Sequence, residues 1–222
     1  MWWRALGVAA LLLGMGVAGG YAVADRTASE PAHGSEVEPV PAVSPAVPTP
    51  PALNIRPDPD TPALEPDLPS TPEDLRPERG GAGVTVNIPD GWTENRVQDT
   101  NMWNFVKTGN PENTYTMRIN IVRALNVSVS AAKQGRIIAL EEADANGGLS
   151  EFEVTAQTED TLEATYIDGG YFRLTMETWV SFDGTHAYAS AAVTGRTVDE
   201  EGLRDLLSRT VDSMVALPAK DQ

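Results

Sequence analysis

Cysteine is absent from the 222 residues of the chain. Its absence excludes disulfides, thiolate nucleophiles, thiolate metal sites and the acylated cysteine of a lipoprotein. Basic residues are few, with 16 Lys and Arg against 32 Asp and Glu, and the net charge is −16. Because nucleic acids and anionic bilayer surfaces attract Lys and Arg, we expect no nucleic-acid partner and no electrostatic membrane contact of the soluble part.

Aromatic residues are missing from the stretch 25–80, which instead holds 14 of the 17 prolines. Such a composition has too little apolar surface to offset the entropy lost on ordering. We therefore predict a Pro-rich disordered linker over 25–80, acting as a spacer. Only 81–217 has the composition of a folded domain, and 218–222 is a short tail.

Charge is almost absent from residues 1–24, where Arg4 is the single charged residue. The uncharged run Ala5–Ala24 would span roughly 30 Å as a helix, the thickness of a bilayer core. We predict a single-pass membrane anchor in the cell membrane, with a cytoplasmic N-terminus and the C-terminal domain outside. The alternative is a signal peptide cleaved after Ala24 and a secreted domain, because Ala22 and Ala24 fit the small-residue cleavage pattern.

The stretch Tyr171–Val193 is predicted to form the central hairpin of the domain. Residues of Tyr171–Val180 alternate in the period of two that a pleated strand requires, and Phe182–Thr185 supplies turn chemistry. The return strand, Ala187–Val193, carries small side chains on one face. Burial is expected on both faces of this hairpin.

Further alternating segments predict an antiparallel sheet of six or seven strands covered by two helices, an α+β class. The other predicted strands are 84–88, 103–107, 115–122, 152–158 and 162–167. The first helix is expected to begin at a Ser128 or Ser130 cap and to end near Ala145. Its expected apolar stripe comprises Ala131, Ala132, Gly135, Ile138 and Ala139. The second helix is expected to begin at a capping box of Thr197 and Glu200. Its expected stripe comprises Leu203, Leu206, Leu207, Val211 and Met214.

Several short motifs, in their order along residues 83–216, resemble a known family. They are Pro89-Asp90-Gly91-Trp92 after the first strand, Tyr115-Thr116-Met117-Arg118, the Ser-capped helix, the Trp179 strand, Thr194-Gly195-Arg196, and the Leu-rich last helix with Ser213-Met214. In these features the chain resembles the LpqN/LpqT-type envelope proteins of actinobacteria, which have a PsbP-like α-β-α sandwich. The resemblance implies an extracytoplasmic, non-enzymatic role near the cell envelope. The lipoprotein members carry an acylated cysteine, which this chain lacks.

No residue set in the sequence predicts catalysis. Ser181, Asp183 and His186 lie within one tight turn, where they cannot line up as nucleophile, orienter and base. The acidic run around Glu141 and Glu142 has no companion histidine and is typical of a solvated helix face. We therefore expect a non-enzyme with no cofactor and no metal. The alternative function is an envelope-associated lipid transferase or hydrolase.

The candidate ligand-binding residues are aromatic side chains with an adjacent arginine. They are Trp92, Trp103, Tyr171, Arg173 and Trp179. Aromatic rings offer stacking area and arginine a charge-assisted donor, a combination that suits sugars or lipid head groups. We thus expect the domain to bind an envelope lipid, glycolipid or protein partner where the tryptophans gather. In the alternative interpretation, the row with Arg173 and Glu177 lies under a helix and those two side chains neutralise each other.

Overall fold

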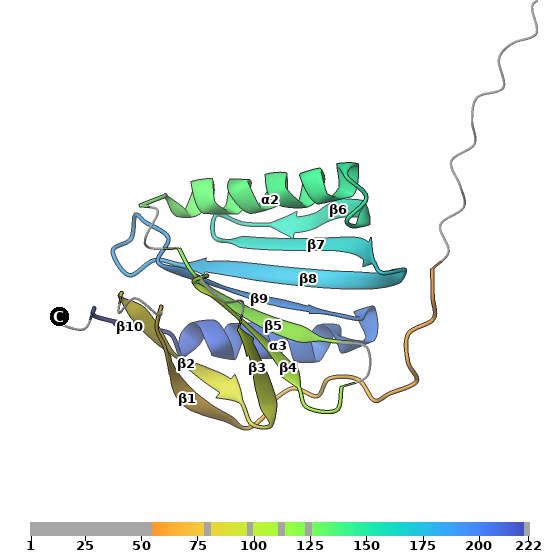
Figure 1. Cartoon of the computed structure of the whole chain (residues 1–222), viewed down its shortest axis with the longest axis horizontal. Helices are drawn as coiled ribbons and strands as arrows, with labels where there is room; N and C mark the ends of the chain where they lie inside the picture. Colours follow the sequence, from red (N-terminus) through yellow and green to blue (C-terminus); the bar gives the residue numbers. More distant parts are fainter. Residues whose placement is uncertain (1–54, 78–80, 97–99, 111–113, 123–125, 220–222) are drawn as a thin grey trace, which may run out of the picture. The chain divides into compact units, whose positions relative to one another are not determined.

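The computed structural model describes residues 55–77, 81–96, 100–110, 114–122 and 126–219. All of these lie in one unit, residues 51–222. They form two antiparallel sheets and two α-helices (Figure 1). The predicted membrane anchor lies outside the described residues, and none of the helices within them has the length and apolarity to cross a bilayer.

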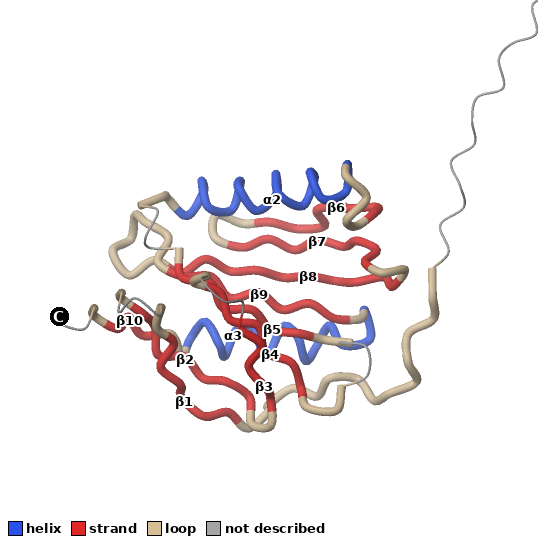
Figure 2. The backbone as a smooth tube through the Cα atoms, viewed as in Figure 1, coloured by secondary structure: helices blue, strands red, loops and turns tan. Residues whose placement is uncertain are grey.

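The larger sheet has seven strands in the order β3-β4-β5-β9-β8-β7-β6 (Figure 2). Its strands are β3 (Trp92–Arg96), β4 (Met102–Lys107), β5 (Thr116–Ile121), β6 (Ser150–Gln157), β7 (Thr161–Asp168), β8 (Tyr171–Val180) and β9 (Ala189–Gly195). The predicted central hairpin is confirmed, since β8 and β9 pair from Val180↔Ala189 to Leu174↔Gly195 inside the sheet. Both faces of β8 are buried from Arg173 to Glu177.

A second sheet of three strands was not expected. It consists of β1 (Ser70–Leu75), β2 (Gly83–Pro89) and β10 (Val215–Leu217), with β2 in the middle. The predicted strand 84–88 is therefore correct as a strand but wrong as a member of the larger sheet, where β3 provides the seventh strand. Alternation along β2 buries Val84, Val86 and Ile88 against the main core.

Helix α2 (Val129–Ala145) begins at Ser128, whose hydroxyl accepts a hydrogen bond from the backbone N–H of Ala131 at 3.1 Å. This confirms the Ser128 cap. Of the predicted apolar stripe only Ala132 packs inward, because Ile137 and Leu140 are the buried residues of the helix and Ile138 is 44% exposed. Ile137 and Leu140 bury far more apolar area than the small residues of the predicted stripe, and they pack with Leu162 and Trp179 on one face of the large sheet.

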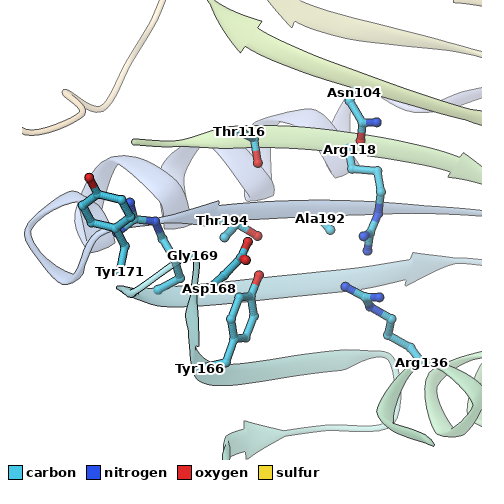
Figure 3. Close-up of a pocket in the computed structure, with 11 residues that line it drawn as sticks. Asn104, Thr116, Arg118, Arg136, Tyr166, Asp168, Gly169, Tyr171, Ala192 and Thr194 are labelled. Carbon is cyan, nitrogen blue, oxygen red and sulfur yellow. The ribbon is translucent and has the colours of Figure 1, made fainter. Parts of the chain in front are cut away.

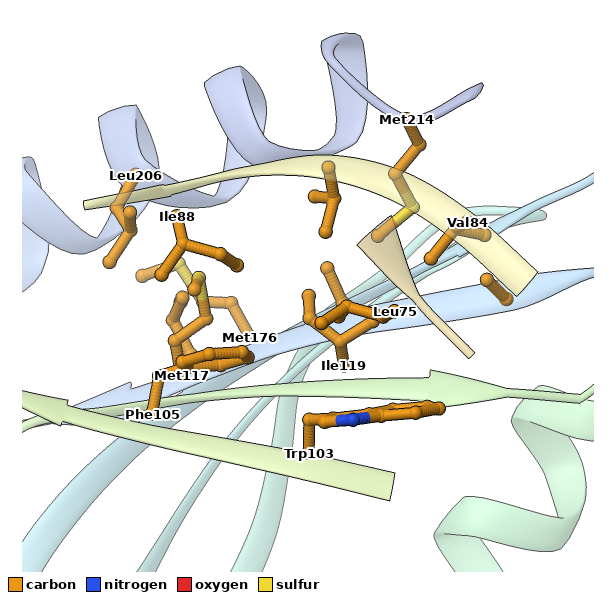
Figure 4. Close-up of a cluster of buried hydrophobic side chains, with 14 of the residues drawn as sticks. Leu75, Val84, Ile88, Trp103, Phe105, Met117, Ile119, Met176, Leu206 and Met214 are labelled. Carbon is orange, nitrogen blue, oxygen red and sulfur yellow. The ribbon is translucent and has the colours of Figure 1, made fainter. Parts of the chain in front are cut away.

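Helix α3 (Glu200–Asp212) lies on the opposite face and contacts β8, β9 and β2. Leu203, Leu206 and Met214 are buried and Leu207 and Val211 partly buried, so the predicted stripe of this helix is confirmed. Figure 4 shows the cluster that these side chains complete, filled also by Trp103, Phe105, Met117, Ile119 and Met176. The cluster lies between the two sheets and α3 and forms the main core.

The capping box before α3 is not the predicted pair of Thr197 and Glu200. A 3₁₀ turn, η3 (Thr197–Asp199), precedes the helix, and the reciprocal bonds join Arg196 and Asp199. The backbone N–H of Arg196 donates to Asp199 Oδ2 at 3.0 Å. Asp199 is fully buried and Arg196 is 2% exposed, so the box is part of the interior.

The predicted disordered linker is wrong for residues 55–77. Strand β1 pairs with β2 from Ser70↔Pro89 to Leu75↔Val84, and Leu64 and Leu75 are buried in the main core. Just before Leu64 the backbone is held by Arg196, which donates to the carbonyls of Pro59, Thr61 and Pro62. The composition of this segment wrongly predicted disorder for two reasons. An edge strand accepts proline, and burial of two leucines on an apolar surface is enough to hold the segment in place.

Candidate functional site

A groove of about 410 Å³ lies on the face of the large sheet that is turned away from the main core. Alternation along β5 sends Met117 and Ile119 into the core and Thr116 and Arg118 into the groove. Nine of the eleven residues that line the groove are polar or charged. The lining consists of Asn104, Thr116, Arg118, Arg136, Tyr166, Asp168, Gly169, Tyr171, Arg173, Ala192 and Thr194 (Figure 3).

At one end of the groove Arg118 reaches Glu177 across a small residue. Arg118 on β5 is paired with Ala192 on β9, which is in turn paired with Glu177 on β8. Neighbouring strands are about 4.8 Å apart, so the two backbones are separated by roughly 10 Å. The Arg118 side chain lies over the Ala192 methyl group and donates to Glu177 Oε2 at 2.7 Å. A larger residue at position 192 would occupy that path.

The second cation at this end, Arg136, comes from α2. Figure 3 shows the guanidinium groups of Arg118 and Arg136 directed toward one another over the sheet. Arg136 Nε lies 3.2 Å from Glu177 Oε2, near enough for charge attraction, but it lacks hydrogen-bond geometry. Burial, and then the like charge of Arg118, lower the pKa of Arg136 below its ordinary value. Two cations thus share one carboxylate.

Glu177 already accepts two hydrogen bonds from residues other than Arg136. Its Oε1 accepts from Ser190 Oγ at 2.8 Å, and its Oε2 accepts from Arg118. Glu177 is 5% exposed, whereas the side chains of Arg118 and Arg136 remain 21% and 26% exposed. The carboxylate is therefore enclosed, and the excess positive charge faces the groove.

The opposite end of the groove combines an aromatic ring with a buried arginine. The guanidinium carbon of Arg173 lies 4.9 Å from the ring centroid of Tyr171, a cation–π distance. Arg173 also donates to Asp58 Oδ1 at 2.7 Å. Asp58 belongs to the segment that precedes β1. In the same segment, the backbone N–H of Arg56 donates to the carbonyl of Gly170 at 2.7 Å. The segment 55–60 therefore borders this end.

The middle of the groove presents neutral hydrogen-bonding groups and one acid. Tyr166, Asp168 and Thr194 point into the space between the two ends (Figure 3). These groups both donate and accept, as is needed to hold the hydroxyls of a sugar or polyol. The groove thus offers cations at one end, an aromatic ring at the other, and hydroxyl-binding groups between them.

The tryptophans predicted to gather do not do so. Trp103 is 2% exposed and points into the main core, on the face opposite the groove. Trp92 packs at the margin of that core, with its ring 5.8 Å from the ring of Tyr115. Trp179 is 4% exposed under α2. Of the predicted residues, the structure brings together Tyr171 and Arg173 at the groove and places the three tryptophans in packing roles.

The alternative interpretation of this row holds in part, since Trp179 lies under α2. Arg173 and Glu177 do not satisfy each other, because Arg173 pairs with Asp58 and Glu177 with Arg118. Sequence reasoning missed Arg118 and Arg136. A signal for Arg118 was present, because a charged residue between Met117 and Ile119 in a strand must face a polar surface. No such signal marked Arg136, whose approach depends on the rotation of α2.

Ser181, Asp183 and His186 form a turn and not a catalytic relay. Asp183 Oδ1 accepts from the backbone N–H groups of Thr185 and His186, and its Oδ2 lies 3.0 Å from His186 Nδ1. Ser181 Oγ also donates to Asp183, at 3.1 Å, so the acid and not the histidine is the partner of the serine. These hydrogen bonds, first those from His186, hold the pKa of Asp183 well below its usual range.

Comparisons with known proteins find similar structures only. No family model and no curated protein matches the chain. A mutant of the protein Mog1 is similar at a TM-score of 0.42 and 11% identity, over 67% of this chain and 97% of that one. LpqN of Mycobacterium tuberculosis, described as involved in cell envelope biogenesis, is similar at a TM-score of 0.39 and 13% identity, over 68% and 92%. LpqN, after which the family expected from the sequence motifs is named, is thus among the solved structures that are similar to this chain.

Proposed function

We propose that the chain is a non-catalytic, membrane-tethered binding protein whose extracytoplasmic domain holds the polar head group of an envelope lipid or glycolipid in the groove of the large sheet. The observation that carries the proposal is the lining of that groove, polar or charged at nine of eleven positions. An apolar acyl chain would leave these groups without partners, at a cost of about 1–3 kcal/mol for each buried one. A sugar, polyol or phosphate-bearing head group satisfies them.

The side chains of the groove favour binding over turnover. Its cations, phenols and hydroxyls include no serine or lysine beside a base, and Asp168 is its one lining carboxylate. Hydrolysis or transfer of a head group needs an activated nucleophile or a second acid–base group in reach of the ligand. For the alternative function, an envelope hydrolase or lipid transferase, the exposed turn offers a histidine beside a carboxylate, His186 and Asp183.

Filling the groove tests the proposal. The full-length chain, kept in a polyoxyethylene detergent, is incubated with an envelope extract, and captured lipids and glycans are identified by mass spectrometry. Thr116→Trp places a ring in the groove and is expected to abolish capture. The control is Thr155→Trp, the same change at an exposed position on the edge strand β6, which should capture as the wild type does. Equal capture by both variants contradicts a groove ligand.

An activity measurement separates the two functions. Ester or glycoside hydrolysis by the wild type that disappears in His186→Ala would identify the protein as an enzyme whose active site is the exposed turn.

Trp179→Ala is a poor test of binding, because this ring packs in the interior with Ile137 and Leu140.

The membrane tether is the second part of the proposal and rests on the uncharged run Ala5–Ala24. Protease added to intact cells should remove the domain and leave the N-terminal segment with the membrane fraction. If the signal-peptide alternative holds, the protein is instead recovered from the medium and begins at Asp25.

A protein partner, the remaining alternative ligand, would show as a specific cross-link to the same groove.

A further inference from the structure

The structure carries a more specific inference about the ligand of the groove, which rests on the proposed function. We infer that the Arg118 and Arg136 end is a phosphate site, so that the ligand is a phosphate attached to a hydroxyl-rich group such as a sugar or polyol.

Positive charge is in excess at this point of an otherwise acidic protein. Arg118 and Arg136 face Glu177, whose two oxygens already accept from Ser190 and Arg118. Arg136 Nε is the one buried side-chain nitrogen or oxygen, among the described residues, that lacks a hydrogen-bond partner. Glu177 Oε2 lies 3.2 Å from this buried nitrogen, while the Arg136 side chain as a whole is 26% exposed. An oxyanion in the groove would therefore accept from the terminal nitrogens of Arg136 and compensate its charge.

The direction of approach favours phosphate over carboxylate. Arg118 rises from β5 and Arg136 descends from α2, so their donors converge from two elements on one point (Figure 3). A carboxylate presents two oxygens in one plane, whereas the oxygens of a tetrahedral phosphate point in several directions and can accept from guanidinium groups on two sides. A phosphate also carries up to two negative charges, which match the two cations better than a single charge does.

The rest of the groove orients the ligand. Asp168 repels a second anion, and with Tyr166 and Thr194 it offers partners for hydroxyls. At the far end the guanidinium groups of Arg173 and Arg56 lie over the ring of Tyr171, with their central carbons 4.9 and 5.9 Å from its centroid, and this cluster closes the groove. The ligand therefore lies with its phosphate between Arg118 and Arg136 and its hydroxyls toward Asp168.

Glucose 6-phosphate and glucose are suitable probes, titrated calorimetrically into the full-length chain in polyoxyethylene detergent. Glucose 6-phosphate should bind more tightly than glucose. Arg136→Met leaves the Arg118–Glu177 pair in place and should weaken glucose 6-phosphate binding by about tenfold or more, with little effect on glucose. Lys133→Met is the matched control: it removes one positive charge from the same helix, outside the groove lining. We expect a change within about twofold for this variant.

Equal affinity for the two probes, or equal weakening by Arg136→Met and Lys133→Met, overturns the inference. A measurement on the wild type guards against misfolding of the variants. Inorganic phosphate should shift the Nε–H NMR signals of Arg118 and Arg136 and leave that of Arg204, which is bound by Glu163 and Glu200, in place. Uniform shifts of all three, or none, also contradict the site.

The source of the phosphate is distinguished by two short-chain lipids in the same titration. Dihexanoylphosphatidylglycerol carries a phosphate next to free hydroxyls, and dihexanoylphosphatidylcholine carries a phosphate without them. Binding of the first and not of the second identifies a lipid head group, and binding of glucose 6-phosphate alone identifies a soluble phosphosugar. If envelope glycans are lost in Thr116→Trp but no phosphate probe binds, the proposed function stands and the phosphate inference fails. If Thr116→Trp retains every ligand, both fail.

Discussion

Arg196 and Asp199 form a buried ion pair, with 2.7 Å between Arg196 Nη2 and Asp199 Oδ1, and together they fasten a segment more than 130 residues away. Arg196 donates to three carbonyls of residues 59–62, and Asp199 Oδ1 accepts from the backbone N–H of Leu64 at 2.9 Å. The side-chain hydrogen bonds that Arg196 donates to Asp199 raise the pKa of Arg196. The proline-rich chain before the domain is thereby made part of its interior.

Arg196→Met is expected to destabilise the protein strongly. It removes the donors for three carbonyls and leaves Asp199 charged and buried, a change that typically costs about 3–5 kcal/mol. Urea unfolding of the full-length chain measures the loss. Arg209→Met is the matched control, because Arg209 is 41% exposed and its distances to Asp67 and Asp205 are 3.6 and 3.5 Å. An exposed pair should contribute no more than about 1 kcal/mol, and similar losses in the two variants would contradict the role of Arg196.

Gly202→Ala should separate α3 from the same segment. A Cβ at position 202 would lie 2.1 Å from the carbonyl oxygen of Leu64, so the backbone must move. We expect a loss of about 1–3 kcal/mol, as for other overpacked sites. Gly135→Ala is the control, since a Cβ there meets no atom within 4 Å, and it should stabilise α2 by about 0.5–1 kcal/mol. Faster proteolysis between residues 55 and 68 in Gly202→Ala alone would locate the effect.

A chain that begins at Gly81 should fold less well than one that begins at Pro51. The shorter chain lacks β1, Leu64 and Leu75, and thereby exposes Val84 and Val86. Burial of a single leucine side chain contributes about 1.5–3 kcal/mol, so the two lost leucines are a large share of the stability of such a domain. Urea midpoints of both chains provide the measurement. Equal midpoints would show that residues 55–77 rest on the domain without stabilising it.

Asp183 should titrate well below an ordinary aspartate, whose pKa is about 3.9. Its folded pKa is lowered by hydrogen bonds from His186 and Thr185, so the linked stability is present above the unfolded value and disappears as pH falls through the folded one. Carboxyl carbon NMR of the folded chain, compared with the chain in urea, measures both values. Because Asp183 is exposed, solvent screening keeps its contribution to stability small. Ser181→Ala removes one of the hydrogen bonds that Asp183 accepts and should raise the pKa of Asp183 in the folded chain slightly. A folded value equal to that in urea would show that the turn opens in solution.

The groove illustrates how far residue patterns reach. Alternation within β8 correctly places Arg173, Thr175, Glu177 and Trp179 on one face, and the identity of β8 and β9 as a paired hairpin follows from the same rule. The partners of those side chains do not follow, because Arg118 and Glu177 are 59 residues apart and meet only across Ala192. The positions of the tryptophans could not be predicted for a related reason, because a large aromatic ring stabilises a hydrophobic core as well as it binds a ligand.

Residue patterns were enough to predict most of the local elements: seven of the ten described strands, both helices, the Ser128 cap and the apolar face of α3. These depend on neighbours within a few residues, so they can be read from a short window. Tertiary structure alone decided that residues 55–77 are ordered, that β2 leaves the large sheet for a smaller one, and that Arg136 turns toward Arg118. Each of these three features depends on a surface that is assembled from distant segments of the chain. Burial of two leucines, strand pairing at an edge or a particular rotation of a helix is favourable only when that surface has formed.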